Sequence, residues 1–168
     1  MPSLRAIAGS RPATLASMLS RLLVTLQFAL IAALAVPRGA PDVGAWVAVL
    51  TRVPAVLPIA GGIALGLWAL GVNRPGNFNV RPEPRPGGHL VTTGPYRFIR
   101  HPMYLAVLLF AAGLVLGDVV PWRVAAFIAL AAVLHAKAAI EERLLRDTHP
   151  GYADYARRTP RVIPFLHL

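Results

Sequence analysis

The sequence contains no cysteine, a single lysine and only seven acidic residues among its 168 positions. Without cysteine, the chain can form neither a disulfide framework nor a thiolate metal site, and it has no thiol nucleophile. Charged residues make up 14% of the chain, whereas soluble domains typically carry about 25%. Together with a hydrophobic share of 56%, this low charge excludes an ordinary soluble domain and indicates segments that lie in lipid.

The few charged residues are mostly basic, and the formal net charge is +10. A nucleic-acid-binding protein would carry such charge along one exposed face. Here the arginines instead lie between long apolar runs, which is typical of the short loops of membrane proteins, where they contact anionic lipid. We therefore predict membrane lipids, and no nucleic acid, among the partners.

Four apolar stretches predict an all-α integral membrane helical bundle of about four transmembrane helices. They are residues 22–36, 53–72, 103–117 and 124–136. The last two are each short for a span, and the tight turn between them predicts a helical hairpin. Residues 44–50 form a further short apolar segment, which we expect to lie separately at the outer interface.

The first apolar stretch has two interpretations. Its basic start, its length and the sequence Ala33-Leu34-Ala35 are also typical of a secretory signal peptide with a cleavage site. Residues 17–19 extend the apolar run, which favours a retained transmembrane helix. Whether this segment is retained or cleaved stays open at this stage, and in both cases the segment that follows it lies outside.

The distribution of arginine predicts the orientation in the membrane. The N-terminal segment, the central loop 73–101 and the tail from residue 141 hold 3, 5 and 5 arginines, against three on the opposite side, at positions 38, 52 and 123. Arginine-rich loops face the cytoplasm, so we predict a multi-pass protein with both termini cytoplasmic. The central loop and the tail then meet at the cytoplasmic face. Prolines at 82, 84 and 86 exclude a regular helix in this loop, and loops of this length are usually functional.

A first group of candidate functional residues lies at the end of the central loop. Pro102 suits the first turn of a helix, where its missing N–H costs nothing. His101 is therefore predicted at the N-cap of the third span, with Tyr104 in its first turn. Taken alone, these residues could be no more than a capping histidine and an interfacial tyrosine.

A second group lies where the fourth apolar stretch ends. Lys137 and Glu141 are four residues apart and share a helix face, whereas Glu142 points elsewhere because a helix turns by about 100° per residue. A solvated Lys–Glu pair would be the simplest interpretation. Ionisable groups near lipid are, however, functional candidates by default.

The C-terminal half carries a combination of motifs in a fixed order. They are the stretch 88–104 with its Arg-His-Pro-x-Tyr segment, the pair Glu141-Glu142, Tyr152-x-x-Tyr155 and Thr159-Pro160-Arg161-x-x-Pro164. In order and spacing they resemble the isoprenylcysteine carboxyl methyltransferase family and the related phospholipid methyltransferases of membranes. The Arg-His-Pro-x-Tyr segment alone would be a weak signal, but its combination with the hairpin, the acidic pair and the tail is specific. The N-terminal half is similar only in consisting of apolar spans.

The resemblance implies an S-adenosylmethionine-dependent methyltransferase in a single membrane domain, with residues 1–72 as N-terminal spans and 73–168 as the catalytic core. The cofactor-binding residues that it implies are Gly88, His89, Leu90, Val91, Tyr96, His101, Pro102, Met103, Tyr104, Glu141 and Glu142. It also implies Lys137 and Glu141 as catalytic residues, and no metal site.

The resemblance further implies that the methyl acceptor is a lipophilic or small molecule at the cytoplasmic membrane face. Lys137 stands where eukaryotic members of the family carry an arginine that binds the carboxylate of their substrate. Lysine keeps the charge but lacks the bidentate geometry of a guanidinium group, so a prenylcysteine-like acid is not the expected acceptor. The sequence identifies neither the acceptor nor the oligomeric state.

Two other functions are compatible with parts of the sequence. Membrane sterol reductases share a similar Arg-His-Pro-x-Tyr segment and use NADPH, but they resemble this chain only locally and have many more spans. The chain could also be a non-catalytic membrane protein that retains the fold. Methyl transfer fits the absence of cysteine, because an in-line displacement requires alignment and exclusion of water rather than a nucleophilic side chain.

Overall fold

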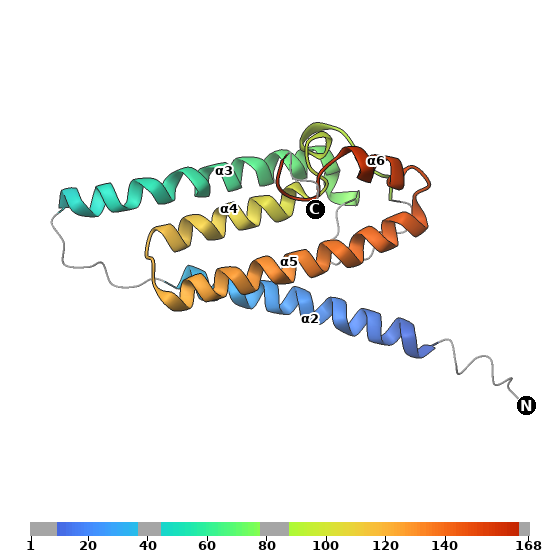
Figure 1. Cartoon of the computed structure of the whole chain (residues 1–168), viewed down its shortest axis with the longest axis horizontal. Coiled ribbons are helices and arrows are strands. Elements are labelled where there is room, and N and C mark those ends of the chain that lie inside the picture. Colours follow the sequence, from blue (N-terminus) through green and yellow to red (C-terminus); the bar gives the residue numbers. More distant parts are fainter. Residues whose placement is uncertain (1–9, 37–44, 78–87, 165–168) are drawn as a thin grey trace, which may run out of the picture.

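The computed structural model describes residues 10–36, 45–77 and 88–164, and within these ranges every regular element is helical. The elements are α2 (Ser10–Ala35), α3 (Ala45–Asn77), the 3-10 helix η1 (Gly94–Arg97), α4 (Pro102–Leu116), α5 (Pro121–Thr148) and α6 (Tyr152–Arg158). The four long helices run alongside one another, with α4 between α3 and α5 (Figure 1). The predicted all-α helical bundle is confirmed.

Three helical segments are long and apolar enough to cross a membrane, namely Ala16–Ala35, Val53–Asn73 and Pro121–Thr148. Helix α4 has 15 residues. At about 1.5 Å per residue it is about 22 Å long, shorter than a hydrocarbon core of about 30 Å. Helix α4 forms the predicted hairpin with α5. Of the about four transmembrane helices predicted from the sequence, three are thus long enough to span a membrane by themselves, and α4 is a shorter apolar helix.

Helix α3 is longer than the sequence analysis predicted. The segment from Ala45 onward was expected to lie apart from the second span, but α3 is continuous from Ala45 to Asn77. That expectation was wrong because alanine, leucine and valine extend a helix without a break, and the prolines that follow are tolerated in membrane helices. Gly44 and the loop prolines at 82, 84 and 86 lie outside the described residues.

Helices α3 and α4 approach each other closely through glycine. A Cβ atom added at Gly62 of α3 would lie 2.6 Å from the carbonyl oxygen of Ala106, and one added at Gly113 of α4 would lie 2.7 Å from that of Ala55. Contacts of this kind are typical of membrane helices, where small residues let two backbones meet. The glycines therefore fix the position of α4, whose first turn carries the candidate site.

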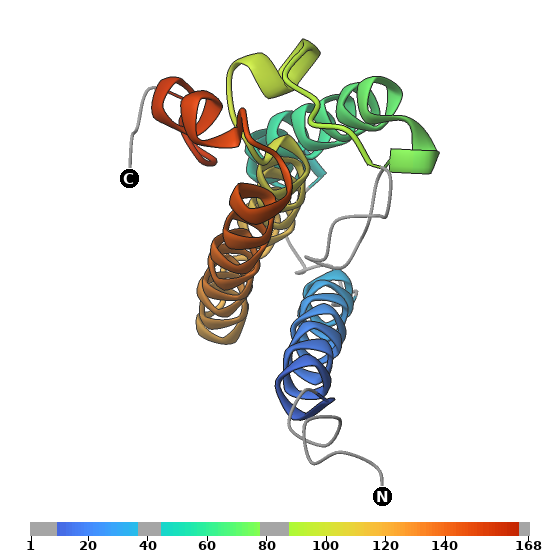
Figure 2. The same cartoon turned by 90° about the vertical axis from the view of Figure 1, so that its right-hand side faces the viewer.

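Helix α2 packs against α5 and also touches α4, and Figure 2 shows it well separated from α3. Leu34 of α2 is 1% exposed and joins a buried apolar cluster with Ala111, Leu130 and Leu134. Nearby, buried Arg123 donates hydrogen bonds to two carbonyl oxygens near helix ends, those of Val36 at 2.7 Å and Leu114 at 3.1 Å. Arginine can satisfy such carbonyl groups, so this contact ties α2 to the hairpin.

The opposite end of the bundle gathers the polar elements. The start of α2, the end of α3, the start of α4 and the end of α5 lie at one end, together with η1 and α6 (Figure 1). The loop before α4 and the tail after α5 therefore meet, as the sequence predicted. That this end is cytoplasmic stays a prediction.

Candidate active site

The tail after α6 pairs with the segment that leads into α4. The backbone N–H groups of Arg100 and His101 donate hydrogen bonds of 2.9 Å to the carbonyl oxygens of Pro160 and Arg161, respectively. The Tyr155 hydroxyl donates a hydrogen bond of 2.6 Å to the carbonyl oxygen of Tyr96 in η1. Hydrogen bonds from backbone N–H groups and from a tyrosine side chain thus hold the tail against the loop.

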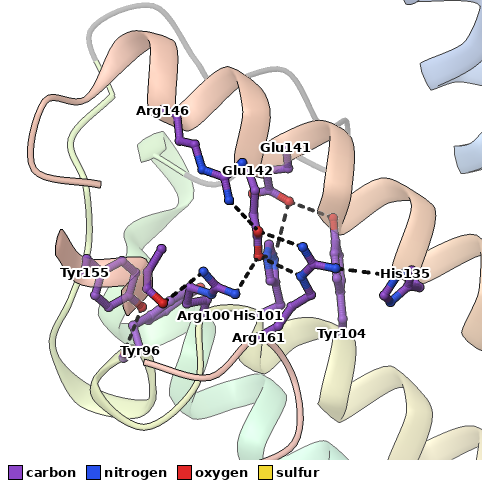
Figure 3. Close-up of polar contacts among 11 residues, drawn as sticks. Tyr96, Arg100, His101, Tyr104, His135, Glu141, Glu142, Arg146, Tyr155 and Arg161 are labelled. Carbon is purple, nitrogen blue, oxygen red and sulfur yellow. Dashed lines mark hydrogen bonds and ion pairs between the residues drawn. The ribbon is translucent and has the colours of Figure 1, made fainter. Parts of the chain in front are cut away.

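Glu142 is the centre of the polar cluster (Figure 3) and its side chain is 1% exposed. It accepts hydrogen bonds from Nε and Nη2 of Arg161, at 3.0 and 2.9 Å, and from Nε2 of His101 at 3.1 Å. Ion pairs with Arg100 at 3.3 Å and Arg146 at 3.5 Å complete its surroundings. A buried carboxylate requires such compensation. Glu142 therefore joins α5, the loop and the tail.

The protonation states of two neighbouring groups outside the spans follow from this packing. The hydrogen bond to Glu142 raises the pKa of the Arg161 guanidinium group above its usual value, so it stays charged. Burial raises the pKa of Tyr96 to about 12. The Tyr96 hydroxyl therefore stays protonated near neutral pH.

Glu141 has a different environment from its neighbour. Its Oε2 atom accepts a hydrogen bond of 2.8 Å from the Tyr104 hydroxyl and lies 3.7 Å from Nδ1 of His101. The rings of His101 and Tyr104 are stacked, with centroids 5.0 Å apart and planes 5° from parallel. The side chain of Glu141 is 30% exposed. Within the described ranges, Tyr104 provides the hydrogen bond that this carboxylate accepts, and Oε1 accepts none.

Lys137 is buried rather than solvated, with 1% of its surface exposed. Its ammonium group donates a hydrogen bond to Oε1 of Gln27 on α2. It also lies 5.3 Å from the centroid of the Tyr104 ring, within the range of a cation–π contact. The interpretation of Lys137 and Glu141 as a solvated surface pair is therefore excluded.

His101 occupies the predicted N-cap position of α4, and Pro102 follows at the start of the helix. Its side chain makes no capping hydrogen bond. The ring instead contacts both acidic residues and stacks on Tyr104. A capping role therefore does not account for the imidazole.

The structure brings together His101, Tyr104, Lys137, Glu141 and Glu142, five of the predicted site residues. Pro102 is buried and Met103 is half-buried in the first turn of α4. The predicted loop wall has mixed exposure: Gly88, Leu90 and Val91 are half-buried and His89 is exposed. This loop is tied to the end of α5, since the Gly88 carbonyl oxygen lies 3.2 Å from Nε2 of His149. Cofactor binding by all of these residues stays a prediction.

The predicted site residues did not include Arg100, Arg146 and Arg161 around Glu142, or Gln27 beside Lys137. Arg100 and Arg161 belong to the motifs but carry no obvious role in the sequence, because their partner Glu142 is distant along the chain. Gln27 is an amide within an apolar span, and polar residues at such positions are usually functional. That signal could have identified Gln27, although not its partner.

These features define a helical membrane protein with a polar site at one end of its bundle. Residues 51–150 match the family model described as phospholipid methyltransferase, and the chain belongs to this family. Helix α2 and the tail from Tyr152 onward lie outside the matched residues.

Two curated proteins are similar to this chain over 87 residues. The cobalt-zinc-cadmium resistance protein CzcN of Cupriavidus metallidurans is 44% identical over 50% of this chain and 39% of its own length. The nickel-cobalt-cadmium resistance protein NccN of Alcaligenes xylosoxydans xylosoxydans is 41% identical over 50% of this chain and 40% of its own length. The match thus spans about two fifths of each relative.

Proposed function

We propose that this protein is an S-adenosylmethionine-dependent methyltransferase that acts at the cytoplasmic membrane face on a lipophilic or small acceptor. The observation that carries the proposal is the Glu141 carboxylate, which Tyr104 holds by one oxygen and whose side chain is 30% exposed beside His101. Membership of the phospholipid methyltransferase family supports the same reaction class.

The residues at this position fit the cofactor by their chemistry. S-adenosylmethionine supplies a methyl group on a positively charged sulfur and also carries an ammonium group, a carboxylate and ribose hydroxyls. Oε1 of Glu141 can accept a hydrogen bond from the ammonium group or from a ribose hydroxyl. Tyr104 holds the carboxylate in place beside the His101 ring.

The chain's own contribution to the reaction is to bind, align and exclude water. Glu142 holds the tail against the loop through Arg100 and Arg161 and so keeps that side of the site closed. Lys137 lies 5.3 Å from the centroid of the Tyr104 ring and is hydrogen-bonded to Gln27 of α2. We assign Lys137 to the acceptor and Glu141 to the cofactor. No side chain needs to form a covalent intermediate.

Calorimetry with S-adenosylmethionine on the detergent-purified protein tests the proposal, followed by transfer of a radiolabelled methyl group into a membrane lipid extract. We expect saturable binding and a labelled product. Binding of NADPH instead would indicate a reductase. Binding of S-adenosylmethionine without transfer to any lipid, amine, thiol or carboxylate acceptor would indicate a non-catalytic protein.

The names of the two relatives call for a control with metal ions. Across the described part of the chain, no group of three or more His, Cys, Asp or Glu side chains could hold a metal ion. The same calorimetry with Zn²⁺, Co²⁺ and Cd²⁺ should give no specific binding. Tight metal binding together with no binding of S-adenosylmethionine would contradict the proposal.

A further inference from the structure

A hydrogen bond inside the bundle joins two residues that are 110 positions apart. Gln27 of α2 accepts it through Oε1, and Lys137 of α5 donates it through Nζ. Both side chains are buried, with 7% of Gln27 and 1% of Lys137 exposed. Helix α2 lies outside the residues that match the family, whereas Lys137 lies within them. The contact therefore links α2 to the part of the chain that matches the family model.

An ammonium group has three donors, and leaving a buried charge without partners is costly. Among the residues that the structure describes, Gln27 is the single hydrogen-bond acceptor of Lys137. The ammonium group of Lys137 also lies 5.3 Å from the centroid of the Tyr104 ring, where a cation–π contact stabilises its charge. Gln27 thus contributes a large part of what keeps the ammonium group in place.

Glu141 is the group that competes with Gln27 for Lys137. It lies one helical turn further along α5, on the same face, and attracts Lys137 electrostatically. Its Oε1 atom is also the oxygen that we assign to the cofactor. If Lys137 turned towards Glu141, it would pair with that oxygen and would lose its hydrogen bond to Gln27 of α2.

We propose that Gln27 is a positioning residue that holds Lys137 towards α2 and away from Glu141, which makes α2 a part of the acceptor half of the site. This inference rests on the proposed function, since it concerns the residues assigned there to the cofactor and the acceptor. It predicts that replacing Gln27 weakens cofactor binding because Lys137 is released and pairs with Glu141.

The test is a double-mutant cycle with Gln27→Leu, Lys137→Met and the double variant, measured as the dissociation constant of S-adenosylmethionine and as turnover. Gln27→Leu should weaken cofactor binding by about threefold to tenfold, because the released lysine pairs with Glu141. Lys137→Met should leave cofactor binding near the parental value and lower turnover. The double variant should regain parental cofactor affinity, because no lysine remains to compete.

Two further variants separate positioning from packing. Gln27→Glu keeps an oxygen at the same position and should bind the cofactor like the parent. Ser20→Ala removes another buried polar side chain from α2, whose hydroxyl bonds the carbonyl oxygen of Ala16 in its own helix. It should also behave like the parent. A loss in Ser20→Ala equal to that in Gln27→Leu would assign the effect to helix packing and overturn the inference.

The remaining outcomes are equally decisive. Parental cofactor affinity in Gln27→Leu, or losses that simply add in the double variant, would overturn the role of Gln27 while leaving the proposed function intact. A parent protein that binds no S-adenosylmethionine would overturn both.

Discussion

Glu141 and Glu142 are adjacent on α5, yet 30% of the first side chain is exposed and only 1% of the second. Successive residues of a helix differ in direction by about 100°. Glu141 therefore meets Tyr104 of α4, whereas Glu142 meets Arg161 of the tail. This difference separates a partly exposed carboxylate from a buried one that holds the tail against the loop.

Glu142→Gln should destabilise the protein. The substitution removes the counter-charge of Arg100 and Arg161 from a side chain that is 1% exposed, and breaking a buried ion pair typically costs about 3–5 kcal/mol. We expect a clear decrease in the unfolding temperature in detergent and faster proteolysis within the tail. Arg146→Gln is the control, because its side chain is 50% exposed and 3.5 Å from Glu142. It should cost less than about 1 kcal/mol.

Glu141→Gln should leave the unfolding temperature close to that of the parent but weaken the binding of S-adenosylmethionine. Loss of a charge-assisted hydrogen bond of about 1.5–3 kcal/mol corresponds to an increase in the dissociation constant of about tenfold to a hundredfold. Calorimetry measures this directly. An unchanged dissociation constant would remove Glu141 from the cofactor site.

Tyr104→Phe tests how Glu141 is held. The variant keeps the ring that stacks on His101 but loses the hydroxyl that bonds Glu141. Cofactor binding should weaken by less than in Glu141→Gln, while helix content by circular dichroism stays unchanged. His101→Ala should weaken cofactor binding too. If both variants bind the cofactor as the parent does, the two rings serve only the fold.

Gly62→Ala should disturb the packing of α3 on α4. The added Cβ atom would lie 2.6 Å from the carbonyl oxygen of Ala106 and 2.8 Å from the amide nitrogen of Phe110, so the helices must separate. Overpacking of this kind typically costs about 1–3 kcal/mol. Gly61→Ala is a matched control, since nothing lies within 4 Å of its added Cβ atom. Equal unfolding temperatures for the two variants would contradict this packing.

The orientation in the membrane is open to a direct test. Reporter fusions after Leu168 and within residues 36–44 should report opposite sides, with Leu168 in the cytoplasm, as the distribution of arginine predicts. A fusion at Leu168 that reports the outer side would contradict the predicted topology and the cytoplasmic location of the site.

The sequence predicted those features that local rules determine. Pro102 at the start of α4, the hairpin with α5 and the different directions of Glu141 and Glu142 follow from helix geometry and are confirmed. The contacts of His101 could not be predicted, because Glu142 is 41 residues away in the sequence. Only packing of the tail on the loop shows which carboxylate is buried.

The backbone pairing of His101 with Arg161 has a consequence for biosynthesis. At about 5–20 residues per second, a ribosome adds Arg161 about 3–12 seconds after His101. Helices α2 to α5 are therefore translated before the tail residues that contact them. A nascent chain released before residue 161 would contain these helices, yet it would lack the guanidinium group that is hydrogen-bonded to Glu142. The contacts of the tail with Glu142 and with the segment before α4 can thus form only after helices α2 to α5 have been translated.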